Sequence, residues 1–195
     1  MKLATPRQDG GLSLERCIAQ RRSVRSFGNQ ALTKDELGQL LWAAQGLTGS
    51  DGGRTVPSAG ALYPLELYAA ASNVASLPAG VYRYLADGRE LARGVAGLHS
   101  EALVAAAHGQ DWIAAAPLCL CIAAVFERTT VKYGDRGRGF VYLEAGHAAE
   151  NVMLQAVALG LATTMVGAFD DEKVGRVLGL EANITPLCLI PVGRP

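Results

Sequence analysis

The apolar stretch Leu118–Phe126 limits what this chain can fold into more than any other part of the sequence. It belongs to the longest apolar run, Ile113–Phe126, which Pro117 interrupts and which is shorter than the roughly 20 residues a membrane-spanning helix needs. A short run of this kind predicts a strand that is buried on both faces. Because such a strand needs a layer against each face of its sheet, we expect a central sheet flanked by helices.

Several helices are expected around this strand. Thr33 and Glu36 form a capping-box pattern before an apolar stripe that ends near Gly46, which predicts a helix between them. The segment between Gly46 and Gly60 is expected to form a long loop. Long loops in compact domains tend to be functional. The other expected helices are a short one after Ser13, then Ser100–His108, Phe140–Leu159 with Gly160 as its cap, and Asp170–Leu178 closed by Gly179.

The remaining strands complete the expected fold. They are Leu65–Ala71 and Val81–Leu85, which could pair as a hairpin, then Thr163–Phe169 and Pro186–Val192. The pattern predicts an α+β or mixed α/β fold with a mainly antiparallel central sheet. We expect one domain over residues 1–195, with a flexible N-terminus over residues 1–11.

Charge and composition exclude several classes of protein. The 18 basic and 18 acidic side chains leave no net charge to attract polyanions, which argues against nucleic-acid and membrane-surface binding. The first residues lack the apolar core of a signal peptide, so we expect a cytoplasmic protein. No metal site is expected, because His99 and His108 have no suitably spaced partners. The cysteines form no Cys-x-x-Cys pair and are expected to be buried, reduced thiols: Cys17, Cys119, Cys121 and Cys188.

An arginine cluster follows the first expected helix. Arg21, Arg22, Ser23 and Arg25 could hold a phosphate through charge-assisted hydrogen bonds, and Arg194 near the C-terminus could complete that site. The alternative is that these are solvated arginines near the C-terminus of a helix, where cations offset the helix dipole.

Two stretches of small residues could lie against a flat ligand. Pro57, Ser58, Ala59 and Gly60 lead towards a strand and would let main-chain amides approach a planar ring, although the same sequence could be an ordinary turn. The second stretch places a glycine inside a strand-like run, which marks either a ligand contact or a bulge. It consists of Met165, Val166, Gly167 and Ala168.

In this order and spacing, six segments resemble the FMN-dependent nitroreductase family, and within it the SagB-type branch of thiazole- and oxazole-forming dehydrogenases. The resemblance extends from Leu12 to Pro195. The segments are RRSVRSF (21–27), LTKDELGQLLWAAQG (32–46), PSAGALYPLELY (57–68), KYGDRGRGFVYLEAGHAAENVMLQAVALGL (132–161), VGAFDD (166–171) and PLCLIPVGRP (186–195).

The resemblance implies a nitroreductase-like fold and a flavin site built by a homodimer. Arg21, Arg22, Arg25 and Arg194 would hold the FMN phosphate, with Ser23 near the phosphate or the ribityl chain. The segment from Pro57 to Gly60 would reach the flavin of the partner subunit, and Met165 to Ala168 would lie along the ring, with one main-chain N–H donating to flavin N5.

The long helix would lie in the dimer interface, where the small residues Ala145, Gly146, Ala148 and Ala149 suit close packing. The alternative is the buried central helix of a monomer.

A Lys-Tyr pair is the candidate catalytic group. In azoline-oxidising members of the family such a pair takes part in proton abstraction, which implies that role for Lys132 and Tyr133. The alternative is a solvated lysine beside a packing tyrosine. His147 and Glu150, on the long helix, are expected to pack and form hydrogen bonds. The asparagine that classical nitroreductases carry shortly after the Pro-Ser pair is missing, because Ala61–Tyr63 stands in its place. This weakens the expectation that the protein reduces nitro drugs.

The expected activity is ping-pong electron transfer through FMN, with NAD(P)H reducing nitroaromatic or quinone-like acceptors. The sequence has no GxGxxG fingerprint, so a nicotinamide would bind transiently over the flavin. One alternative is oxidation of azolines to thiazoles or oxazoles, which would need separate partner proteins. Further alternatives are a non-catalytic flavin store or sensor, or a simple anion-binding patch.

Overall fold

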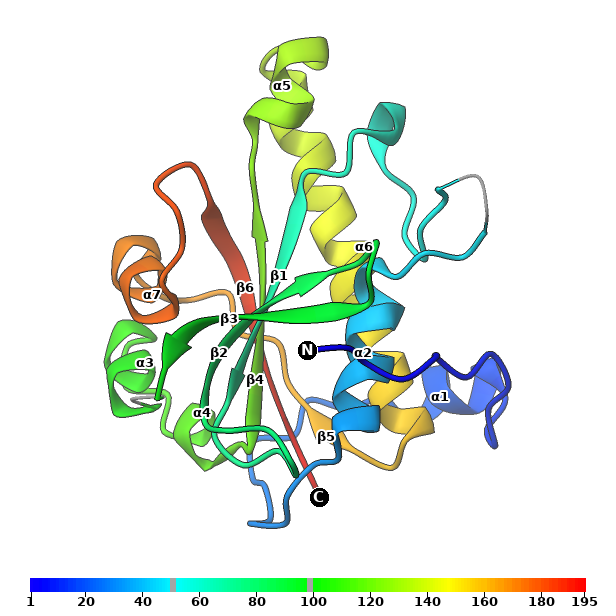
Figure 1. Ribbon diagram of the computed structural model, residues 1–195, viewed down its shortest axis with the longest axis vertical. Helices are drawn as coiled ribbons and strands as arrows, with labels where there is room; N and C mark the ends of the chain where they lie inside the picture. Colours follow the sequence, from blue (N-terminus) through cyan, green and yellow to red (C-terminus); the bar gives the residue numbers. More distant parts are fainter. Residues whose placement is uncertain (50–51, 98–99) are drawn as a thin grey trace.

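A six-stranded sheet forms the centre of the protein. The structure is a computed structural model that describes residues 1–49, 52–97 and 100–195. The strand order is β3-β2-β1-β4-β6-β5, and every neighbouring pair is antiparallel (Figure 1). The strands are β1 (Leu65–Ala71), β2 (Gly80–Leu85), β3 (Glu90–Ala96), β4 (Leu118–Ala124), β5 (Ala162–Thr163) and β6 (Thr185–Gly193). The predicted α+β fold with an antiparallel sheet is confirmed.

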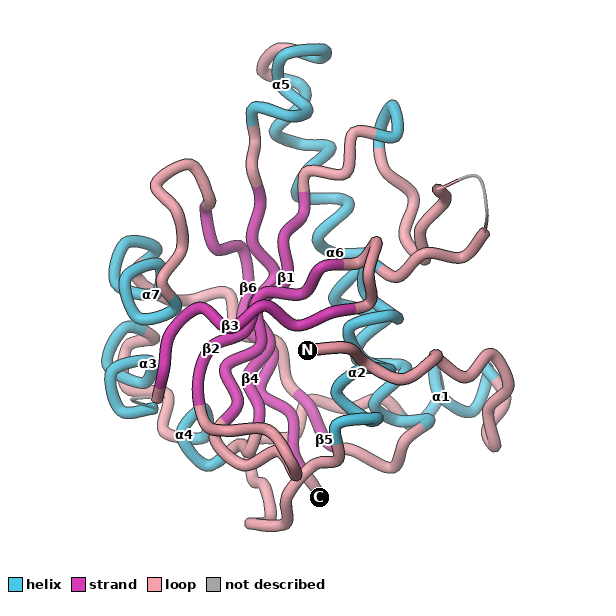
Figure 2. The backbone as a smooth tube through the Cα atoms, in the orientation of Figure 1, coloured by secondary structure: helices cyan, strands magenta, loops and turns pink. Residues whose placement is uncertain are grey.

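Helices cover both faces of this sheet. Helices α2 and α6 pack on one face, and α3, α4 and α7 pack on the other (Figure 1). The helices are α1 (Leu14–Gln20), α2 (Lys34–Gln45), α3 (Ser100–Ala106), α4 (Trp112–Ala115), α5 (Glu127–Tyr133), α6 (Arg136–Ala158) and α7 (Asp171–Leu178). A short 3-10 turn, η1 (Ala59–Ala61), lies between α2 and β1 (Figure 2).

Strand β4 is buried along its whole length, as predicted. Leu120 and Ile122 pack on the α2 and α6 side, whereas Cys119 and Cys121 pack on the opposite side. All four cysteines are buried free thiols. Burial raises the pKa of the Cys119 thiol to about 12, which keeps this thiol neutral and unreactive.

The predicted capping box starts α2. The Thr33 hydroxyl accepts the Glu36 N–H at 3.1 Å, and the Glu36 carboxylate accepts the Thr33 N–H at 2.8 Å. At the end of α7, Gly179 takes the left-handed conformation with a φ of 66°. Local sequence chemistry therefore set these helix ends.

Other elements differ from the prediction. The predicted strand Thr163–Phe169 is reduced to β5, because the chain leaves β6 after Thr163 and meets it again only where Val166 pairs with Leu189. Helix α6 begins at Arg136, and β3, α4 and α5 were not predicted. The N-terminus was predicted to be flexible, whereas its first residues run beside β3 and bury Leu3. Two positions of the predicted loop (50–51) and His99 lie outside the described residues.

The small residues of α6 do not form the exposed face that the sequence suggested. Ala145, Ala148 and Ala149 are buried in the protomer's own core, and only Gly146 of this group is exposed. The exposed apolar side chains of α6 are instead Tyr142 and Leu143. Among the described residues, no helix combines the length and the apolar character needed to cross a membrane.

Candidate active site

The arginine cluster and the C-terminus meet beside β5. Ser23 pairs with Thr163 in a parallel bridge, and the Val24 N–H donates to the Thr163 carbonyl at 2.8 Å. The Gly28 N–H donates to the Arg194 carbonyl at 3.0 Å. Main-chain pairing thus brings both ends of the sequence to the edge of the sheet where β6 ends.

Of the four candidate phosphate arginines, Arg21, Arg25 and Arg194 differ in how free their guanidinium groups are. The Arg194 guanidinium lies 2.8 Å from a Glu36 carboxylate oxygen. The Arg21 Nε lies 3.7 Å from a carboxylate oxygen of Glu150. Arg25 is exposed and stacks 5.6 Å from the Trp112 ring, with no carboxylate partner among the described residues. Arg25 is therefore the cation that an incoming anion meets without displacing a carboxylate.

Arg22 has a different role from its neighbours. Its Nη1 donates to the main-chain carbonyls of Ala19 at 3.0 Å and Arg21 at 2.7 Å. These carbonyls lie at the C-terminal end of α1, where helices leave acceptors unpaired. For Arg22, the geometry favours the helix-capping alternative.

The stretch Met165–Ala168 presents main-chain groups at the same edge. Val166 is buried and exchanges two hydrogen bonds with Leu189, of 2.8 and 2.9 Å, so its N–H is not free. Met165, Gly167 and Ala168 are exposed, and the N–H groups of Gly167 and Ala168 have no partner within the described ranges. A Cβ on Gly167 would meet open space. This leaves exposed main-chain donors at the small residues Gly167 and Ala168.

We call residues Pro57–Gly60 the strap. It packs against α6, where Ser58 and Ala59 line a hollow together with Glu144 and His147. The Ser58 hydroxyl accepts the Tyr63 N–H at 2.9 Å, and Gly60 takes a φ of 65°.

The candidate catalytic pair meets the strap. A Cβ added to Gly60 would lie 2.8 Å from the Tyr133 hydroxyl and 3.0 Å from the Lys132 Nζ. The functional ends of both side chains therefore converge on Gly60, where any larger residue would displace them. Lys132 itself is exposed.

The strap and the arginine cluster lie at opposite ends of β4. The strap enters β1, whose first residue, Leu65, pairs with Ala124 at the end of β4. The arginine cluster joins β5, and β5 pairs with Val192, the partner of Leu118 at the start of β4. At about 3.3 Å per residue, β4 separates the two groups by about 20 Å. A single chain does not bring its own strap to its own arginine cluster.

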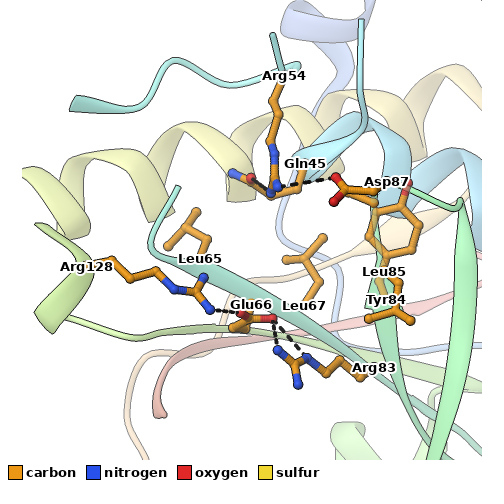
Figure 3. Close-up of a pocket in the computed structure, with 11 residues that line it drawn as sticks. Gln45, Arg54, Leu65, Glu66, Leu67, Arg83, Tyr84, Leu85, Asp87 and Arg128 are labelled. Atoms are coloured by element: carbon orange, nitrogen blue, oxygen red, sulfur yellow. Dashed lines mark hydrogen bonds and ion pairs between the residues drawn. The ribbon is translucent and has the colours of Figure 1, made fainter. Parts of the chain in front are cut away.

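A paired ion cluster fixes the chain where the strap joins β1. Glu66 is 8% exposed and lies 3.0 Å from the Arg83 guanidinium and 2.6 Å from that of Arg128 (Figure 3). Arg128 also donates to the Tyr63 carbonyl at 3.0 Å. The adjacent cavity of about 230 Å³ is lined by these paired charges, so we interpret it as structural.

Glu144 is a buried acid on α6 that the sequence patterns did not single out. It is 3% exposed, and its Oε1 has no hydrogen-bond partner among the described residues. Burial raises the pKa of the Glu144 carboxyl, and nearby Ser58, Gln45 and the positive charge of Arg54 oppose that rise. Its burial could have been inferred from spacing, because Glu144 lies three residues after the apolar Val141 and so falls on the same buried face of the helix.

Comparison with known proteins identifies the chain. The model of the nitroreductase family matches residues 18–194. The chain belongs to the nitroreductase family. It is an oxidoreductase, and members of this family generally use a flavin and are generally dimeric.

Two close relatives carry the same assignment as nitroreductases. One, from Methanocaldococcus jannaschii, is 45% identical over 183 residues, which are 94% of this chain and 91% of that protein. The other is a crystal structure from Ralstonia eutropha with a TM-score of 0.85 and 31% identity, covering 100% of this nitroreductase and 88% of the other chain.

A third relative is a processing protein for microcin B17. The microcin B17-processing protein McbC of Escherichia coli is 29% identical over 141 residues, which are 69% of this chain but 52% of McbC. A chain of the E. coli microcin synthetase McbBCD complex has a TM-score of 0.77 and 25% identity, covering 95% of this nitroreductase and 73% of that chain.

The buried Glu144 makes stability depend on pH. A raised pKa means that the folded state binds the proton more tightly than the unfolded state. Stability therefore falls as the pH rises from the ordinary glutamate value of 4.5 through the raised pKa. Glu144→Gln removes this ionisation, so the variant should gain stability relative to wild type as the pH increases. Urea unfolding between about pH 4 and pH 8 measures this, and a pH-independent difference would contradict it.

Proposed function

We propose that this nitroreductase binds FMN and transfers electrons by a ping-pong mechanism, with NAD(P)H as donor and nitroaromatic or quinone-like compounds as acceptors. One observation supports this most: the exposed Arg25 and the free N–H groups of Gly167 and Ala168 lie at one edge of the sheet. An FMN needs both kinds of group, a cation for its phosphate and main-chain donors beside its ring.

These residues fit the cofactor in distinct ways. Arg25 would meet an anionic group directly, whereas Arg21 and Arg194 would share theirs with Glu150 and Glu36. Because Val166 N–H is taken by Leu189, the Gly167 N–H is the next donor available for flavin N5. When bound, FMN would supply the electron-carrying chemistry, and the protein would orient it and limit access of water.

We propose that two subunits build each site. The strap of one chain would cover the flavin held by the arginine cluster of the other, because these groups lie at opposite ends of β4. Exposed apolar side chains on α1, α5 and α6 would be covered by such a partner. They are Leu14, Ile18, Val131, Tyr142 and Leu143.

The four free thiols are in keeping with a cytoplasmic location.

A second candidate function is oxidation of azoline rings in a modified peptide. Its supporting observation is the convergence of the Lys132 Nζ and the Tyr133 hydroxyl on Gly60, the last residue of the strap. In this role Lys132 would take a proton from one ring carbon, and the flavin would accept the second hydrogen together with the electron pair, as a hydride. The similarity to McbC, a processing protein for microcin B17, favours testing this activity.

Arg25→Ala should weaken FMN binding about tenfold or more, because a charge-assisted hydrogen bond to phosphate is lost. Arg22→Ala is the matched control, since its guanidinium caps α1 and it should leave the Kd within about twofold. Quenching of FMN fluorescence on binding measures both. Equal losses in the two variants would argue against this phosphate site.

Stopped-flow spectroscopy separates the two candidate reactions. If the nitroreductase accepts electrons from nicotinamides, NADH or NADPH should bleach the bound flavin rapidly under anaerobic conditions. Indifference to both donors would contradict the proposed reductase. Reduction of the flavin by an azoline-containing peptide, slowed in Lys132→Ala, would then support the second function.

A further inference from the structure

A carboxyl group lies buried beneath the strap with no role in the proposed chemistry. Glu144 lines the same hollow as Ser58 and Ala59, and its Oε1 lacks a hydrogen-bond partner among the described residues. Burying an unpaired acid costs free energy that an apolar residue at this position would avoid. The surrounding contacts indicate what this acid does.

The Ser58 hydroxyl has one hydrogen left to donate. Its oxygen already accepts the Tyr63 N–H at 2.9 Å, so its own hydrogen needs a separate acceptor. Glu144 and Ser58 line the same hollow, and the Ser58 hydroxyl opposes the rise that burial causes in the pKa of the Glu144 carboxyl. Of the groups that line this hollow, the Glu144 carboxyl is thus the acceptor suited to the Ser58 hydrogen.

The opposite side of Glu144 is held by a second polar chain. Arg54 donates to the Gln45 Oε1 at 3.0 Å, which directs the other end of that amide away from Arg54 (Figure 3). The Gln45 Nε2 is buried and has no hydrogen-bond partner among the described residues, and Gln45 also opposes the rise in the pKa of the Glu144 carboxyl. Arg54 also stacks 4.5 Å above the Tyr63 ring. Arg54 thus links Gln45 to Tyr63, and the Tyr63 N–H is in turn held by Ser58.

We propose that Glu144 is a positioning residue, which takes the hydroxyl hydrogen of Ser58 and so fixes the strap in the orientation that meets the flavin of the partner subunit's site. This role rests on the proposed function, because it is the strap's contact with FMN that gives the orientation a use. Because Glu144 lies on α6 and Arg54 donates to Gln45 on α2, the strap would be tied to these two helices and not to the loop alone.

The geometry distinguishes three substitutions. Glu144→Gln keeps an acceptor oxygen at the same reach and should preserve the strap. Glu144→Asp shortens the side chain by one methylene, and Glu144→Ala removes the acceptor, so both should release Ser58. Glu172→Gln on α7 is the control, because its side chain is 88% exposed and far from the strap in sequence.

Hydrogen exchange of the full-length protein without cofactor tests the strap directly. The Ala61 and Tyr63 amides donate within this segment, at 3.0 and 2.9 Å. They should exchange about tenfold faster in Glu144→Ala and Glu144→Asp, with wild-type rates in Glu144→Gln and Glu172→Gln. Wild-type rates in Glu144→Asp would overturn the proposal, even if Glu144→Ala does not fold.

The midpoint potential of bound FMN tests the role towards the flavin. Glu144→Asp should shift the midpoint potential and raise the Kd for FMN about tenfold, whereas Glu144→Gln should keep the wild-type values. A merely structural residue would not produce this pattern. An unchanged potential in Glu144→Asp would overturn the positioning role. If wild-type protein binds no FMN, the proposed function fails, while the exchange rates still decide whether Glu144 holds the strap.

Discussion

The antiparallel pairing of β4 with β1 on one side and β6 on the other sets the geometry on which the rest of the molecule depends. Its register fixes Leu65 beside Ala124 and Val192 beside Leu118. The strap enters at the first of these ends, and the arginine cluster and the C-terminus gather at the second. A buried strand cannot shift its register without moving apolar side chains to the wrong face. The separation of the two groups is therefore built into the core.

Ion pairs decide which arginines near the proposed phosphate site remain available to a ligand. Glu36 binds Arg194 and Glu150 faces Arg21, so both of these arginines share their charge with a carboxylate. At the other end of β4, Glu66 binds both Arg83 and Arg128. Arg25 has no carboxylate partner among the described residues and is the clearest free cation at the proposed phosphate site.

Much of the fold could be predicted from local patterns, because the capping box of α2 and the continuous apolar run of β4 each depend on neighbouring residues. Strand β3 could not, since its polar residues and Gly94 give no alternation and it is held by pairing with β2. The sequence suggested equal roles for Arg22 and Arg25, yet only tertiary contacts separate a helix cap from a free cation. Glu144 was missed for the same reason, because its burial depends on packing of α6 against the strap.

The central claim is that each flavin site takes its arginine cluster from one subunit and its strap from the other. Co-expression of an Arg25→Ala chain with an Ala59→Trp chain, under different affinity tags, gives mixed dimers whose FMN content can be measured by absorbance. Each variant homodimer should hold little FMN, while the mixed dimer should recover one FMN per two chains, because one of its sites has both parts intact. Mixed dimers that hold no more FMN than the homodimers would contradict the account.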